Sequence, residues 1–198
     1  MKSKNKKKRK IRLLLLLLLI LVAVVLIFFF GSRKESIKHV VRPAETSGSS
    51  SPAQKAEAKT VTLFFLSESD DLLHPEERQV VLNSSSPNDL ARVIVEEVLK
   101  GSSQGRLNAL PEGTRLRQVY VTSDGTAYVD FSRHITSGNY YGSSGEMAAV
   151  YSVVNSLAYN LKSVKKVVFL VEGSEKETLG GHIDLSSPFT PDFSLVAK

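Results

Sequence analysis

The side chains that could do chemistry are few and scattered in this chain of 198 residues. There is no cysteine, which excludes a thiol nucleophile, a disulfide and a cysteine-containing metal site. The four histidines lie far apart in the sequence and are expected at the surface: His39, His74, His134 and His182. The sequence contains no phosphate-binding Gly-Lys-Ser/Thr loop. We therefore expect no catalytic residue, no cofactor and no metal.

Three carboxylates are candidates for acid–base chemistry. Asp124 and Asp130 could form a pair, but Asp124 precedes a glycine and suits a turn. Glu146 lies in the first turn of a predicted helix, where the helix dipole favours a negative charge. The alternative role for Glu146 is a partly buried contact that fixes the loop at 140–141. The sequence leaves these two structural roles open.

An apolar run at 13–30 comes well before these positions and has no polar side chain in its 18 residues. As a helix it would span roughly 27 Å, close to the hydrocarbon thickness of a bilayer. The tail 1–12 holds eight Lys and Arg residues and no acid, so the positive-inside rule keeps it in the cytoplasm and exports the rest. A cleaved signal peptide is the alternative, although three phenylalanines at 28–30 stand where a cleavage site needs small residues.

The chain beyond this run divides into a linker and a domain. The core of residues 31–59 lacks apolar periodicity, which predicts a disordered linker over this range. A globular domain is expected over 60–190, followed by a short tail at 191–198. Outside the basic tail the chain has 18 Lys and Arg residues against 20 Asp and Glu, a net charge near −2. The overall charge of +6 is therefore no sign of nucleic-acid binding.

The domain alternates strand and helix patterns. Residues 60–66 and 167–171 are apolar and β-branched, which predicts strands. Short apolar pieces at 72–73 and 79–82 predict edge strands or extended loop. A helix should begin at the cap Ser86 and end before Gly101, and a second helix carries an apolar stripe, which comprises Met147, Val150, Tyr151, Val154, Ala158 and Leu161.

The register of the hairpin between these helices follows from the alternation of apolar and polar residues along its two strands. A two-residue turn would place the apolar residues of its two strands on different faces. A three-residue loop, 123–125 with Gly125 in the left-handed region, pairs Val121 with Ala127 and Val119 with Val129. The order is β-α-β-β-α-β, which predicts an α+β fold of two layers, a small mixed sheet with two helices on one face.

The motif series along 60–190 resembles the GerMN domain, named for the sporulation and germination protein GerM. The matching stretches are 61–65, 98–101, 110–114, 124–131, Glu146 with 151–157, 167–173, 180–182 and 188–189. The resemblance implies a non-catalytic assembly or scaffolding domain at the bacterial envelope. GerM-like sporulation proteins carry two such modules and a lipidated cysteine, whereas this chain has one module and a membrane-spanning run. A general envelope role is therefore expected, at the cytoplasmic membrane with the domain outside.

An exposed apolar face is also expected. With both helices on one side of a single sheet, the other side would display Phe64, Leu66, Tyr120, Tyr128, Val168 and Leu170. Either a partner or a second copy covers this face, or the chain folds back over it with Phe189, Phe193, Leu195 and Val196. Binding of a wall polymer such as peptidoglycan through Tyr140, Tyr141 and Tyr159 is the alternative to a protein partner.

Overall fold

The computed structural model describes residues 57–138, 140 and 142–198. The expected basic tail, the apolar run 13–30 and nearly all of the linker lie outside the described residues. None of the helices in the described part has the length and apolar character needed to cross a bilayer. The elements in chain order are β1 (Glu57–Leu66), β2 (Leu73–Leu82), α2 (Pro87–Leu99), β3 (Leu116–Val121), β4 (Thr126–Phe131), η1 (Arg133–Thr136), α3 (Gly142–Asn160), β5 (Lys166–Val171), β6 (Ser174–Glu175) and η2 (Phe193–Leu195).

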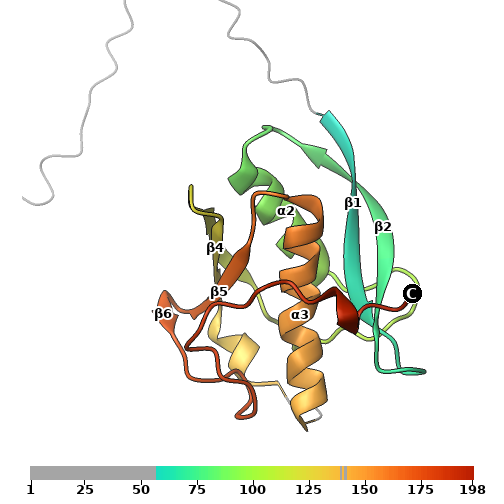
Figure 1. The fold of residues 1–198 in the computed structure, drawn as a ribbon, viewed down its shortest axis with the longest axis vertical. Coiled ribbons are helices and arrows are strands. Elements are labelled where there is room, and N and C mark those ends of the chain that lie inside the picture. The colour runs from blue at the N-terminus through green and yellow to red at the C-terminus, as the bar shows by residue number, and fades with distance from the viewer. Residues whose placement is uncertain (1–56, 139, 141) are drawn as a thin grey trace, which may run out of the picture. The chain divides into compact units, whose positions relative to one another are not determined.

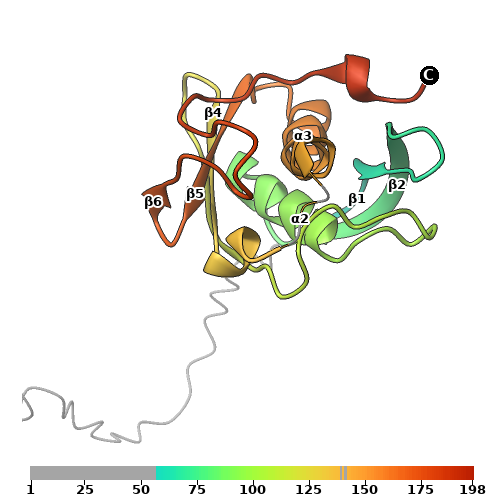
Figure 2. The same ribbon diagram turned by 90° about the horizontal axis from the view of Figure 1, so that it is seen from below.

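The α+β class holds, but the strands form two sheets instead of one mixed sheet. β1 and β2 make an antiparallel pair, and the other sheet has the order β3-β4-β5-β6, with β4 and β5 parallel. Both helices lie between the two sheets, as Figures 1 and 2 show from two directions. The expected arrangement of two layers with one free sheet face is therefore corrected to three layers.

β2 is one continuous strand of ten residues where the sequence predicted separate short pieces. It pairs with β1 along its whole length, from Glu57 opposite Leu82 to Leu66 opposite Leu73. Pro75 interrupts the apolar pattern and has no N–H to donate. An edge strand can hold a proline, because its outer side is not needed for a full ladder.

The predicted start and end of the first helix are confirmed in α2. The Ser86 hydroxyl accepts the Asp89 N–H at 3.1 Å, and Pro87 occupies the first turn. Gly101 follows the helix with φ +83°, the left-handed conformation that an L side chain rarely adopts. The chain can therefore turn sharply into the loop that leads to β3.

The predicted hairpin register is also confirmed. Val119 pairs with Val129 and Val121 with Ala127, and the Thr122 N–H bonds to the Thr126 carbonyl at 2.9 Å around the three-residue loop. Gly125 has φ +89°, and a Cβ there would lie 2.5 Å from the Ser163 carbonyl oxygen. Glycine is thus needed at this position for both conformation and space.

α3 is buried on nearly all sides because it lies between the two sheets. Its buried residues form an unbroken run from 152 to 158, wider than the single apolar stripe that the sequence predicts. Two polar side chains in this helix face the free edge of β1. Ser156 accepts the Phe64 N–H at 3.1 Å, and Asn160 accepts the Thr62 N–H at 2.9 Å while donating to the Thr62 carbonyl at 2.6 Å. These side chains take the place of a neighbouring strand.

Asn160→Ala should lower the free energy of unfolding by about 2 kcal/mol, because it leaves both backbone groups of Thr62 without their partner. Denaturant unfolding of the purified chain measures this loss. Asn83→Ala removes an exposed asparagine and serves as the matched control, with an expected change within about 0.5 kcal/mol. Equal effects of the two substitutions would contradict this role of Asn160.

Candidate functional site

Glu146 is fully buried and binds a loop far along the chain. Its Oε1 atom accepts the N–H groups of Leu179 and Gly180 at 2.9 and 3.0 Å. Its Oε2 atom accepts the His182 N–H at 2.9 Å and lies 3.2 Å from the His182 Nδ1. Burial alone would raise the pKa of Glu146, but the backbone hydrogen bonds outweigh burial and lower it. Glu146 is therefore a carboxylate that holds irregular backbone at 179–182.

This role was only half anticipated. Glu146 makes a buried contact with a loop, and the loop that its hydrogen bonds join is 179–182, while Tyr141 of the expected loop lies outside the described residues. The expected position in the first turn of the helix is wrong, because α3 begins at Gly142 and its first turn holds no acidic residue. Tyr140 is itself buried and donates its hydroxyl to the Ile135 carbonyl. Burial, with the nearby Glu146 charge as a smaller cause, raises the pKa of Tyr140. A Cβ on Gly180 would lie 2.6 Å from the Tyr140 ring, so glycine lets the loop approach.

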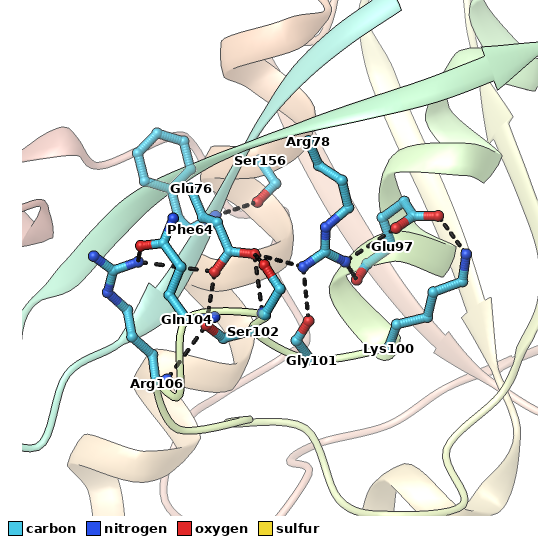
Figure 3. A network of polar contacts seen from close by, with 11 residues as sticks. Phe64, Glu76, Arg78, Glu97, Lys100, Gly101, Ser102, Gln104, Arg106 and Ser156 are labelled. Atoms are coloured by element: carbon cyan, nitrogen blue, oxygen red, sulfur yellow. Dashed lines mark hydrogen bonds and ion pairs between the residues drawn. The ribbon is translucent and has the colours of Figure 1, made fainter.

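A second buried carboxylate, Glu76 on β2, fastens the loop that follows α2 (Figure 3). It accepts hydrogen bonds from the Ser102 hydroxyl at 2.6 Å and from the Ser103 hydroxyl and N–H at 2.7 and 3.0 Å. Arg78 contacts the same carboxylate at 2.6 Å. Burial would raise the pKa of Glu76, yet these hydrogen bonds lower it to about 2.

Arg78 connects Glu76 to the end of α2. Its guanidinium donates to the Gly101 carbonyl at 3.0 Å and to the Glu97 carboxylate at 3.0 Å. The same group lies 5.7 Å from the centre of the Phe65 ring, a cation–π distance. The Glu76–Arg78–Glu97 cluster, seen in Figure 3, thus joins β2, α2 and the loop at 101–106.

The chemistry that these carboxylates can perform is limited by their environment. A general acid or base works best with a pKa near the working pH, and hydrogen bonds keep Glu76 and Glu146 ionised instead. Asp130 binds Arg117 at 2.8 Å and accepts the Gly173 N–H, while Asp124 bonds to the hydroxyl groups beside its turn. The residues that the structure describes hold no cluster of three potential metal ligands.

The six residues expected on one apolar face are divided between the two sheets. Phe64 and Leu66 belong to β1, where Phe64 is 2% exposed against α3 and the C-terminal residues. The outer face of the larger sheet carries the remaining four, and the register aligns them in two rows. These rows are Tyr120–Tyr128–Val168 and Gln118–Asp130–Leu170.

Tyr120 and Tyr128 are the exposed aromatic residues of this outer face. They are directly opposite each other on β3 and β4 and are 53% and 38% exposed. Val168 is buried and Leu170 is half-buried. We call the surface formed by Gln118, Tyr120, Tyr128, Asp130 and Leu170 the tyrosine face.

The sequence of this domain matches a known protein family. The family model Germane, described as sporulation and spore germination, matches residues 62–177, more than half of the chain. The chain belongs to this family. No curated protein matches the sequence.

Two solved structures share the fold of this Germane domain. The first GerMN domain of the sporulation protein GerM from Bacillus subtilis superposes with a TM-score of 0.51 at 22% identity, covering 67% of this chain and 97% of that one. The tandem GerMN domains of the same protein give 0.52 at 20% identity, covering 68% of this chain but only 46% of theirs. The predicted resemblance to a GerM-like domain is therefore confirmed at the level of fold.

Several residues that hold the Germane domain together were missed in the sequence. Glu76 and Arg78 gave a signal, because they stand at the inward positions of β2 that continue as Val80 and Leu82. An acid and a base at alternating inward positions suggest a buried pair. Asn160 and its neighbours in α3 gave only the weaker signal of small polar residues within an apolar helix.

Stability should fall as the pH drops below about 4.5, because the lowered pKa of Glu76 makes its ionised form part of the folded state. A group with a depressed folded pKa stabilises fully above its unfolded value, here 4.5, and loses that contribution as the pH falls toward about 2. The shift corresponds to about 3 kcal/mol. Glu76→Gln should therefore be less stable at pH 7 and should lose this part of the pH dependence.

Denaturant unfolding from pH 7 to pH 2 measures this difference, with Glu112→Gln at an exposed position as the control. If Glu76→Gln and the parent chain lose stability in parallel across this range, the proposed linkage is wrong.

Proposed function

We propose that this Germane domain is a non-catalytic protein-interaction domain, displayed outside a bacterial cytoplasmic membrane by a single helix at 13–30. The observation that carries the interaction role is the tyrosine face. Two tyrosines lie side by side on strands whose backbone is fixed, and they remain 53% and 38% exposed. Tyrosine supplies contact area and a hydroxyl at low entropic cost, and it is enriched in protein interfaces.

The surroundings of the tyrosines suit a protein partner. Arg117 pairs with Asp130 at 2.8 Å and lies 3.7 Å from Glu172, so charged side chains flank the aromatic pair. An aromatic centre with a polar rim is the usual arrangement of a protein interface. The family description, sporulation and spore germination, is consistent with a partner in the cell envelope.

A wall polymer receives less support as the ligand. It was assigned to Tyr140, Tyr141 and Tyr159, of which Tyr141 lies outside the described residues. Tyr140 is buried and offers no ring face to a sugar. Tyr159 is exposed, but its ring packs at 5.5 Å from Phe64 and 6.2 Å from Phe193. These side chains do not form an open aromatic platform.

The non-catalytic part of the proposal is supported by the use of the buried acids. The carboxylate oxygens of Glu76 and Glu146 accept hydrogen bonds from backbone, hydroxyl and guanidinium donors. Neither carboxylate is left with an oxygen free of hydrogen bonds for a substrate. Anchoring rests on the sequence alone, through the apolar run 13–30 and the basic tail before it.

The proposed location predicts which side of the membrane reacts with thiol reagents. The chain has no cysteine, so a single introduced cysteine gives an unambiguous signal. Ser123→Cys, in the exposed hairpin loop, should react with a membrane-impermeant maleimide on intact cells after removal of the wall. Ser3→Cys, in the basic tail, should react only after lysis. Labelling of both, or of Ser3→Cys alone, in intact cells would overturn the orientation.

The interaction role predicts a partner contact at the tyrosine face. A photoreactive amino acid at Gln118, an exposed position in the rows beside Tyr120, should form an adduct with another protein in living cells. The same amino acid at Gln79, exposed on β2, is the control and should not give that adduct. The double variant Tyr120→Ser, Tyr128→Ser should reduce the yield of the adduct at least tenfold without unfolding the chain. Identical adducts from both positions, or none from Gln118, would count against the proposal.

A further inference from the structure

The 192–197 segment lies in a groove between the beginning of β2 and one side of α3. Asn155 on α3 binds its backbone twice, donating to the Asp192 carbonyl at 2.7 Å and accepting the Asp192 N–H at 3.0 Å. At the other end, Val196 forms a parallel bridge with Leu73 of β2, and the Ala197 N–H donates to the Leu73 carbonyl at 3.0 Å. The backbone of the segment is therefore recognised at both ends.

Apolar side chains fill the space between these two ends. The Phe193 ring packs edge-on at 6.0 Å from Phe64, and Leu195 and Val196 pack on the same cluster. Phe64 and Leu73, which form the floor, are each only 2% exposed. The groove thus holds a short segment that turns through the 3-10 helix η2 and presents one aromatic and two aliphatic side chains, Phe193, Leu195 and Val196.

The segment does not fill its groove. A hollow of about 150 Å³ remains beside Leu195, and its lining includes Leu66, Met147 and Ala148. Phe193 remains 46% exposed although its ring packs against Phe64. Segments with few buried contacts open locally at low free-energy cost.

The connection to the rest of the domain is short. Phe189 is fixed on β5 by two hydrogen bonds with Val167, each 2.8 Å. Only Thr190 and Pro191 separate this point from Asp192, where Asn155 begins to hold the segment. Residues 190–191 are therefore the part of the backbone that would have to change if the segment left the groove while Phe189 stayed on β5.

We infer that this groove is a docking site for a second copy of the chain, which inserts its own 192–197 segment by exchange. The exchanged segment makes the same hydrogen bonds and apolar contacts that it makes within one chain. Exchange of identical elements is a low-cost route to a dimer, and residues 190–191 are the part that must change. This association goes beyond the proposed function and depends neither on the tyrosine face nor on the anchor, because it is tested with purified chains.

Binding of the isolated segment tests the groove. A chain that lacks residues 191–198 should bind a fluorescent peptide of sequence 191–198, and the full chain should bind it at least tenfold more weakly because its groove is occupied. Asn155→Ala in the shortened chain should weaken binding about tenfold through loss of two hydrogen bonds. Asn83→Ala, at an exposed asparagine, is the matched control. A shortened chain that remains folded by circular dichroism and binds no peptide overturns the proposal.

The exchange itself is tested with the full chain, so this test does not depend on whether the shortened chain folds. Leu73 and Val196 are bridge partners, close enough for a disulfide when both become cysteine. One full-length copy with Leu73→Cys is mixed with another that carries Val196→Cys, and oxidation should link the two copies. Val81→Cys, at an exposed site on β2 away from the groove, replaces Leu73→Cys in the control. Equal linking in both mixtures, or none with Leu73→Cys, overturns the exchange.

Discussion

The second edge of β1 needs hydrogen-bond partners, and α3 supplies them with side chains instead of a strand. β1 has one edge paired with β2, and the other edge faces α3 at Thr62 and Phe64. Unpaired backbone groups in an interior cost about as much as a lost hydrogen bond. Ser156 accepts the N–H of Phe64, and Asn160 bonds to the N–H and the carbonyl of Thr62. Because the edge is satisfied in this way, β1 does not join β5, and the two sheets lie on opposite sides of the helices.

Three other side chains bind irregular backbone in a similar way. Asn155 binds the 192–197 segment, Glu146 binds the loop at 179–182, and Glu76 binds the loop at 101–106. In each case one side chain from a helix or strand replaces the ladder that another strand would provide. Charged acceptors make stronger hydrogen bonds than neutral ones, and each of the two glutamates holds a loop by several of them.

Features that depend on neighbouring residues could be predicted from the sequence, and features that depend on distant ones could not. The hairpin register followed from the alternation of Val119, Val121, Val129 and their polar neighbours, and the helix start at Ser86 followed from cap chemistry. The contact between Thr62 and Asn160 joins residues 98 positions apart, and no local pattern reports it. For the same reason the placement of Phe64, and the division of the expected apolar face between two sheets, had to come from the structure. A glutamate that accepts hydrogen bonds from backbone N–H groups has partners of any residue type, so no pair of residue types in the sequence points to such a contact.

The contrast between Phe64 and the tyrosine face explains why one apolar surface is closed and the other open. Phe64 points toward α3 and has the 192–197 segment to cover it, because Asn155 and β2 hold that segment in place. Tyr120 and Tyr128 are exposed on the outer face, whereas the chain after β6 pairs through Phe189 with the edge of β5 that does not pair with β4 and then continues to the groove beside α3. Tyrosine rather than phenylalanine at these open positions lets the hydroxyl remain solvated while the ring is available for contact. The fold therefore covers its most apolar side chains with its own chain and leaves amphipathic ones to the solvent side of the larger sheet.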